Sequence, residues 1–113
     1  MVGVERMGVL KGTLELLVLE TLVRRGLPMH GFEILDWIHS TAEDDLLVEE
    51  GALYPALHRM EKRGWLSATW GVSKKGRRAK YYALTEPGRV AAKEEAGRWA
   101  RYVSAVSKLA GQG

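Results

Sequence analysis

The sequence predicts a mostly helical fold with one small β-hairpin. Leu53, Leu57 and Met60 recur at spacings of four and three, which places them on one apolar face of a helix. Two apolar stretches, residues 65–72 and 79–84, follow this helix and flank a short basic loop, as the strands of a hairpin do. A long amphipathic segment comes next. A winged helix-turn-helix followed by a C-terminal helix contains these parts in this order.

The first helix is predicted over residues 10–25, and it is apolar on nearly all its sides. A helix of this kind is buried on two sides, and a chain of 113 residues has little interior to supply both. We therefore expect a second subunit to cover part of it, with Leu10 and Leu14 in the contact. Gly26 and Pro28 predict where it ends.

The second helix is predicted from residue 29 to about residue 41. Phe32 and Ile38 are expected to point inward, together with Ile34 or Leu35, because these positions share one helical face. The acidic stretch that follows, residues 41–47, predicts a connecting loop.

The third helix, between residues 48 and 64, carries one group of the candidate functional residues. Pro55 lacks the N–H that an interior helical position needs, so we expect the helix to begin late or with a distorted first turn, near Gly51. Gly64 predicts its end. The residues that face away from the predicted core are Tyr54, Pro55, His58, Arg59 and Lys62.

The last helix follows the hairpin, whose turn contains Gly76. Thr85 is a natural N-cap for this helix, and Pro87 lies near its first turn. We therefore divide the chain into a winged helix-turn-helix domain, residues 9–84, and a dimerisation helix, residues 85–110. An apolar heptad stripe runs along that helix, and its members are Ala92, Ala96, Trp99, Val103, Val106 and Ala110.

Composition narrows the possible classes of protein. The chain has no cysteine, which excludes disulfides and thiolate zinc sites. No apolar run approaches the ~20 residues that a membrane-spanning helix needs, so we expect a cytoplasmic protein without a membrane partner. The net charge of +3 is unevenly distributed. Residues 58–80 hold eight Lys or Arg residues and one acid, whereas residues 27–57 hold seven acids and no Lys or Arg. A surface polarised in this way suits a polyanion on one side.

Four stretches closely resemble the PadR family of bacterial transcriptional regulators. They are Leu10-Lys-Gly-Thr-Leu-Glu-Leu-Leu-Val-Leu, His30-Gly-Phe-Glu-Ile, Glu50-Gly-Ala-Leu-Tyr-Pro-Ala-Leu-His-Arg-Met-Glu-Lys-Arg-Gly and Gly76-Arg-Arg-Ala-Lys-Tyr-Tyr-Ala-Leu-Thr-Glu-Pro-Gly. The motifs have the family's order and spacing from about Leu10 to Leu109. The single short last helix resembles the subfamily that has one C-terminal helix.

This resemblance implies a homodimer of winged helix-turn-helix subunits, usually a repressor of transcription. It implies that Tyr54, Pro55 and their neighbours approach double-stranded DNA and that Lys74 to Lys80 form the wing. It also implies that the last helix dimerises. Some members bind flat aromatic compounds between paired tryptophans at the dimer centre, and Trp99 matches that tryptophan.

The chain departs from the family pattern at three positions. Glu49 stands where the family often has Ser, which weakens the expected N-cap of the third helix. Ala52 stands where Thr is common, which removes a hydroxyl that would contact DNA. Phe32 replaces the usual Tyr and also loses a hydroxyl.

The candidate DNA contacts divide into two groups. Tyr54 and His58 lie four residues apart on one helical face, beside Gly51, Ala52 and Pro55, so both can reach one groove. The other group would neutralise phosphates, which contributes affinity but little sequence information. Its members are Arg59, Lys62, Lys74, Lys75, Arg77, Arg78 and Lys80. The competing interpretations are a merely solubilising loop for the hairpin cations, interdomain packing for Tyr54 and an ordinary surface position for His58.

Trp99 has two candidate roles, because large aromatic side chains at heptad positions either anchor a dimer core or stack on a planar ligand. The predicted dimer interface comprises Leu10, Leu14, Ala92, Ala96, Trp99, Val103 and Val106. A small aromatic effector at Trp99 is the only small ligand that these arguments suggest, and we predict no cofactor.

Two other classes of function compete with DNA binding. A winged helix can serve as a protein-interaction module, with the basic wing docked on an acidic partner. His30 and Glu33 have the spacing of two metal ligands on one helix, but a role at the helix start is favoured, and we predict no metal site. Ser40, His39 and Asp36 are close in sequence without an elbow or oxyanion motif, so no catalytic set is predicted and the chain is not expected to be an enzyme.

Overall fold

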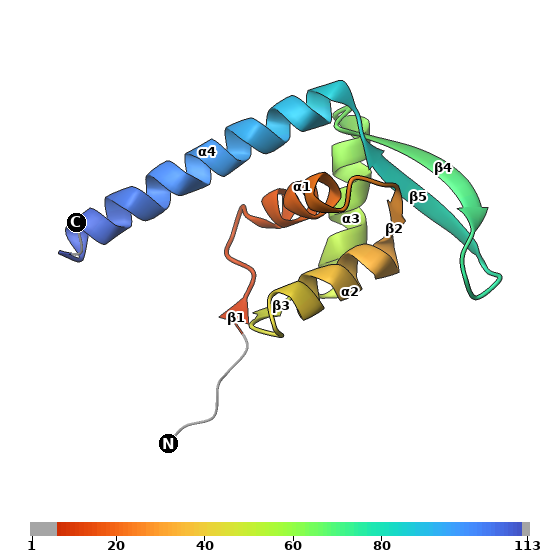
Figure 1. Ribbon diagram of the computed structural model, residues 1–113, viewed down its shortest axis with the longest axis horizontal. Coiled ribbons are helices and arrows are strands. Elements are labelled where there is room, and N and C mark those ends of the chain that lie inside the picture. The colour runs from red at the N-terminus through yellow and green to blue at the C-terminus, as the bar shows by residue number, and fades with distance from the viewer. Residues whose placement is uncertain (1–6, 112–113) are drawn as a thin grey trace, which may run out of the picture.

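The computed structural model describes residues 7–111 and has the predicted mostly helical, winged helix-turn-helix fold (Figure 1). Its helices are α1 (Leu14–Arg25), α2 (Gly31–Thr41), α3 (Glu50–Lys62) and α4 (Glu86–Leu109). Strands β2 (Met29–His30), β5 (Arg78–Leu84) and β4 (Leu66–Val72) form an antiparallel sheet in that order. Strands β1 (Met7–Gly8) and β3 (Leu46–Leu47) form a separate parallel pair.

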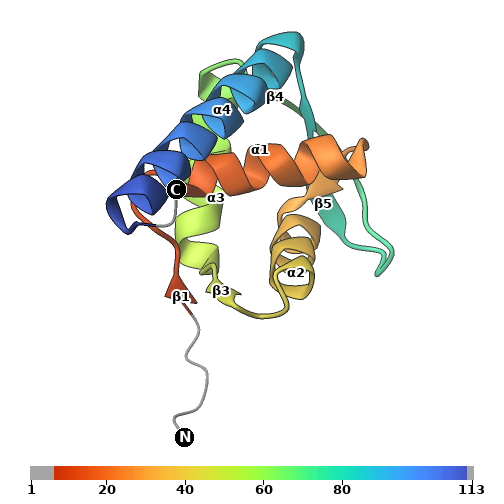
Figure 2. The same cartoon turned by 60° about the vertical axis from the view of Figure 1, so that its left-hand side comes forward.

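The core lies where α1, α2 and α3 pack against one another (Figure 2). The predicted apolar face of α3 is confirmed, because Leu53, Leu57 and Met60 are all 0% exposed. They belong to one core cluster with buried side chains of the other two helices, such as Leu19 of α1 and Ile34 of α2. Burying a large aliphatic side chain stabilises a fold by roughly 1.5–3 kcal/mol, so this face holds α3 in place.

Helix α1 begins four residues later than the sequence predicts, at Leu14. Gly12 has a φ of 83°, a left-handed conformation that interrupts a right-handed helix. Thr13 closes the preceding turn by donating its hydroxyl to the Leu10 carbonyl at 2.7 Å. Leu10 therefore lies outside the helix and is 50% exposed, whereas Val18 and Leu19 are fully buried.

The prediction for the second helix was wrong at its start, because Met29 and His30 form strand β2 and the helix begins at Gly31. His30 is in extended backbone and caps the helix, which prevents a helical start before it. Ile34 and Ile38 point inward as expected. Phe32 was predicted to be buried and is 56% exposed, because Gly31 occupies the inward position in the first turn.

Helix α3 begins at Glu50, one residue before the predicted start, and continues through Pro55. The helix ends at Lys62 with Arg63 as its C-cap, so that Gly64 lies just beyond, as predicted. The hairpin strands shift by one residue from their predicted bounds, because β4 begins at Leu66 and β5 begins at Arg78. The third strand, β2, was not predicted.

Helix α4 begins as predicted, with Thr85 as its N-cap accepting from the Gly88 N–H at 3.1 Å. The Thr85 hydroxyl also donates to the Gly64 carbonyl, and the Thr85 N–H donates to the Trp65 carbonyl at 3.0 Å. These bonds fasten the start of α4 to the corner between α3 and β4. The first turns of α4 pack on α1, and Ala91 is buried there. The rest of α4 extends away from the body of the subunit (Figure 1).

We predict that Gly88→Ala lowers the free energy of unfolding by about 1–3 kcal/mol, the usual cost of overpacking. A Cβ on Gly88 would collide with the main-chain carbonyl of Trp65, which cannot swing aside. Gly97→Ala is the matched control, because it adds the same methyl to the same helix where only the end of Arg101 lies within 4 Å. This control should raise stability by roughly 0.5–1 kcal/mol. Equal effects in chemical denaturation would contradict the close contact at Gly88.

Candidate nucleic-acid interface

The outward face of α3 presents the residues that the sequence placed there. Tyr54, Pro55, His58, Arg59 and Lys62 are all exposed, opposite the buried face of the helix. Gly51 and Ala52 are exposed in its first turn. The structure therefore brings together the whole predicted α3 group on one surface.

The start of α3 is held by main-chain bonds and by a histidine from α2. Glu49 makes no side-chain cap bond, as expected from the absence of Ser at this position. The Glu49 carbonyl accepts from the N–H groups of Ala52 and Leu53, each at 3.0 Å. Just before the helix, the Val48 N–H donates to Nε2 of His39 at 3.1 Å. His39 therefore orients the loop that leads into the recognition helix.

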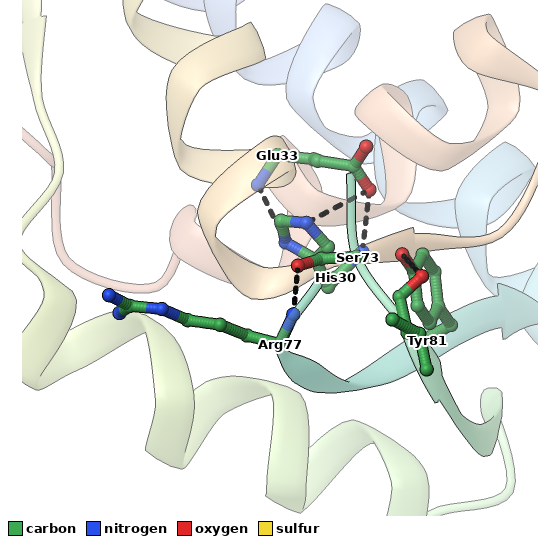
Figure 3. Close-up of polar contacts among 6 residues, drawn as sticks. His30, Glu33, Ser73, Arg77 and Tyr81 are labelled. Atoms are coloured by element: carbon green, nitrogen blue, oxygen red, sulfur yellow. Dashed lines mark hydrogen bonds and ion pairs between the residues drawn. The ribbon is translucent and has the colours of Figure 1, made fainter. Parts of the chain in front are cut away.

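The wing is a regular hairpin with a structured tip. The Ser73 N–H donates to the Arg77 carbonyl at 2.7 Å, and the Arg77 N–H donates to the Ser73 hydroxyl at 3.3 Å (Figure 3). Gly76 lies between them with a φ of 75°, which a tight turn requires. Lys74 and Lys75 are thereby exposed at the tip.

Aromatic side chains that the sequence interpretation missed support several wing cations. The Arg78 guanidinium lies 4.3 Å from the ring centroid of Trp70, its diagonal neighbour across the hairpin. The Lys75 ammonium lies 5.9 Å from the ring of Phe32. Trp70 and Phe32 are 59% and 56% exposed, so these are surface cation–π contacts. The sequence signal that could have identified Trp70 was its position in a predicted strand that pairs with a strand containing basic residues.

Two of the predicted phosphate ligands are paired with carboxylates in the free subunit. Lys80 donates to Glu61 at 2.9 Å, and this hydrogen bond raises the pKa of Lys80 above its ordinary value. Arg59 lies 3.3 Å from Glu15. Within residues 7–111, the remaining predicted phosphate ligands form no ion pair with a carboxylate. These residues are Lys62, Lys74, Lys75, Arg77 and Arg78.

A groove of about 710 Å³ lies between the wing and the first turns of α2 and α3. Tyr54 and Trp70 line it, together with the cations of the hairpin. Partial burial raises the pKa of the Tyr54 phenol, and the nearby Glu50 carboxylate raises it further. A tyrosine phenol is protonated at neutral pH even at its ordinary pKa, and the raised pKa acts in the same direction, so the Tyr54 O–H is a donor.

His30 and Glu33 form a capping box at the start of α2, as Figure 3 shows. The Glu33 N–H donates to Nδ1 of His30 at 3.3 Å, and the His30 N–H donates to the Glu33 carboxylate at 3.0 Å. The His30 ring also meets Tyr81 edge-on at 5.3 Å. Within the described residues no group of three or more His, Asp or Glu side chains is placed to hold a metal ion.

The outer part of α4 presents an exposed apolar stripe. Trp99, Val103 and Val106 are 38%, 42% and 46% exposed, and Ala96 is partly buried. Trp99 stacks on Tyr102 at a centroid distance of 6.1 Å. Ala92, which the heptad pattern assigned to a dimer contact, is 3% exposed and packs instead in the core of its own subunit, because α4 lies on α1 there.

A recognition helix beside a cationic hairpin is the arrangement with which winged helix-turn-helix proteins bind DNA. The fold and this surface therefore define a DNA-binding protein of the winged-helix class. The sequence profile of the transcriptional regulator PadR-like family matches residues 18–94. The chain belongs to this family, and it is a DNA-binding transcriptional regulator.

Solved structures agree with this assignment. A transcriptional regulator from Clostridium thermocellum is similar with a TM-score of 0.77 and 26% identity, over 87% of this chain and 93% of that one. A PadR-like transcriptional regulator from Bacillus cereus has a TM-score of 0.74 and 30% identity, over 92% and 96% of the two chains. A PadR-like transcription factor from Bacteroides fragilis has a TM-score of 0.69 and 31% identity, over 88% and 91%.

The family and these neighbours are transcriptional regulators and not enzymes. Within residues 7–111, no helix has both the length and the apolar character needed to cross a membrane.

Proposed function

We propose that the chain is a homodimeric transcriptional repressor that binds an operator through two winged helices and is released by a small aromatic effector. The observation that supports the dimer is the exposure of Trp99, Val103 and Val106 on the outer part of α4 in the isolated subunit. An apolar stripe at heptad spacing is usually covered by another helix. The second copy supplies that helix, and the dimer contact then runs from Ala96 to Val106.

The proposed dimer presents two copies of the α3 face to one duplex. Dimeric helix-turn-helix proteins contact half-sites about one helical turn apart, or ~34 Å. Tyr54 and His58 would enter the groove, and Arg59 and Lys62 would hold the backbone beside it. Because α3 offers few bidentate readers of base edges, DNA shape and deformability would supply much of the specificity.

The wing would follow the phosphate backbone or the minor groove beside each half-site. Its cations are already oriented, since Arg78 lies on Trp70 and the tip is closed by Ser73 and Arg77. Repression follows if the operator overlaps the promoter, because the bound dimer then occupies DNA that the polymerase needs. This proposal places the chain in the cytoplasm, with the DNA.

Release would begin at Trp99 in the dimer centre. A planar aromatic compound stacked there would favour a dimer whose two α3 helices no longer match the half-site spacing. An effector needs to prefer the non-DNA state by only ~1–3 kcal/mol to relieve repression appreciably.

The first prediction from this proposal concerns phosphate contacts. Arg77→Ala/Arg78→Ala should weaken binding to all duplexes alike. The slope of log affinity against log salt concentration should become less steep by about 0.9 for each lost phosphate contact. Fluorescence anisotropy at several salt concentrations measures both quantities. Arg89→Ala/Arg98→Ala is the matched control, because it removes the same charge from exposed positions on α4. A loss confined to one sequence, or an equal loss in the control, would mean that the wing does not contact phosphates.

A second prediction concerns the dimer. Val106→Asp should weaken self-association at least about 100-fold, because an unpaired charge is costly to bury. Sedimentation velocity across a concentration series measures this change. Ser104→Asp adds the same charge to the exposed helix away from the stripe and should leave the dimer intact. A wild-type protein that sediments as a single chain at working concentrations would refute the proposal.

A third prediction concerns the effector. Planar aromatic compounds should quench tryptophan fluorescence and lower operator affinity, and Trp99→Ala should abolish both effects. Trp70→Phe is the control, because it removes the other strongly exposed tryptophan but leaves α4 unchanged. Quenching that persists in Trp99→Ala would place the effector site elsewhere.

A further inference from the structure

Gly31 and Tyr54 are in unusually close contact where α2 meets α3. An ideal Cβ built on Gly31 would lie 2.7 Å from Cζ and 2.8 Å from Oη of Tyr54, and closer still to Cε1. Ordinary van der Waals contacts of a Cβ lie at 3.4–4 Å. The Tyr54 ring therefore occupies the space that any other residue at position 31 would fill with its side chain.

Space, and not backbone conformation, requires the glycine at this position. The φ angle of Gly31 is not positive, so any L-amino acid can adopt this backbone conformation without strain. It is the first residue of α2, directly after the His30 cap, where alanine is a good helix former. A methyl group at Gly31 would thus disturb Tyr54 and not the helix.

The Tyr54 ring is also the part of this contact that can move. Tyr54 is 44% exposed and borders the groove between α3 and the wing. Its neighbour in sequence, Leu53, is fully buried and holds the backbone of α3 in place. Added bulk at Gly31 would therefore be relieved by rotation of the phenol toward solvent, with the fold unchanged.

We propose that Gly31 is a positioning residue for DNA recognition, because it lets the Tyr54 ring lie against the first turn of α2 at the border of the groove. This inference rests on the proposed use of the α3 face in DNA binding. The packed ring has fewer rotamers to lose when the duplex arrives, so less affinity is spent on ordering it. A displaced ring would neither reach the same atom of the duplex nor be ordered in advance.

The test is a double-mutant cycle measured by fluorescence anisotropy on a labelled duplex from the promoter of its own gene. Gly31→Ala should weaken binding about tenfold, which corresponds to the loss of roughly one hydrogen bond to a charged group. Tyr54→Ala should weaken binding by a similar factor. In the Tyr54→Ala background, Gly31→Ala should change affinity less than about twofold, because the ring through which it acts is gone. Unchanged affinity of Gly31→Ala, or equal losses in both backgrounds, would overturn the proposal.

Two further readouts separate positioning from damage to the fold. The phenol is neutral, so the slope of affinity against salt should be the same in Gly31→Ala and wild type. Gly8→Ala is the control for adding a methyl group, since nothing lies within 4 Å of a Cβ built there and the residue is outside the proposed DNA and dimer contacts, so this variant should keep wild-type affinity. A changed slope, or an equal loss in Gly8→Ala, would count against a specific role for Gly31.

A measurement without DNA keeps the proposal testable even if a variant does not fold. Nuclear Overhauser cross peaks should connect the Tyr54 ring protons with the Gly31 Hα protons in the wild-type protein. A wild type that binds DNA but lacks these cross peaks would overturn the role of Gly31 alone. A wild type that shows them but binds no duplex would overturn the proposed DNA-binding surface, and this role with it.

Discussion

The burial of one face of α3 is the interaction on which the rest of the structure depends. Leu53, Leu57 and Met60 have no exposed surface, so rotation of the helix about its axis would remove them from the core. The opposite face is consequently held in solvent with a fixed orientation. Tyr54 and His58 lie on this exposed face. The burial that stabilises the subunit therefore also leaves these two side chains accessible to a ligand.

The corner where α3, β4 and α4 meet links the recognition surface to the outer helix. Thr85 bonds to the carbonyls of Gly64 and Trp65, and Gly88 approaches the Trp65 carbonyl more closely than any side chain would allow. Because these contacts involve main-chain carbonyls, the Thr85 N–H and the short Thr85 side chain, they fix the start of α4 relative to the end of α3. If two subunits join through the outer part of α4, this corner sets the separation of their recognition helices.

The wing combines positive charge with order. Hairpin cations in solvent would ordinarily sample many rotamers, which costs entropy when they bind. Here Arg78 rests on Trp70, Lys75 lies over Phe32, and Lys80 is bonded to Glu61. The first two contacts orient charge without neutralising it, whereas the third one offsets a charge. The tip and the Arg78 side are therefore the parts of the wing with free positive charge.

Periodicity and local chemistry were enough to predict much of this protein from its residues in order. The spacing of Leu53, Leu57 and Met60 determined which face of α3 is buried, and the cap at Thr85 determined where α4 begins. Such features depend on neighbours within a few residues, so they can be predicted from the sequence.

The local pattern could not predict contacts between segments that are distant in the sequence. Strand β2 forms only because β5 offers it an edge, Ala92 is buried because α4 lies on α1, and Gly31 matters because Tyr54 arrives from another helix. These contacts form only when distant segments of the chain pack together, so a residue's immediate neighbours in the sequence do not specify them.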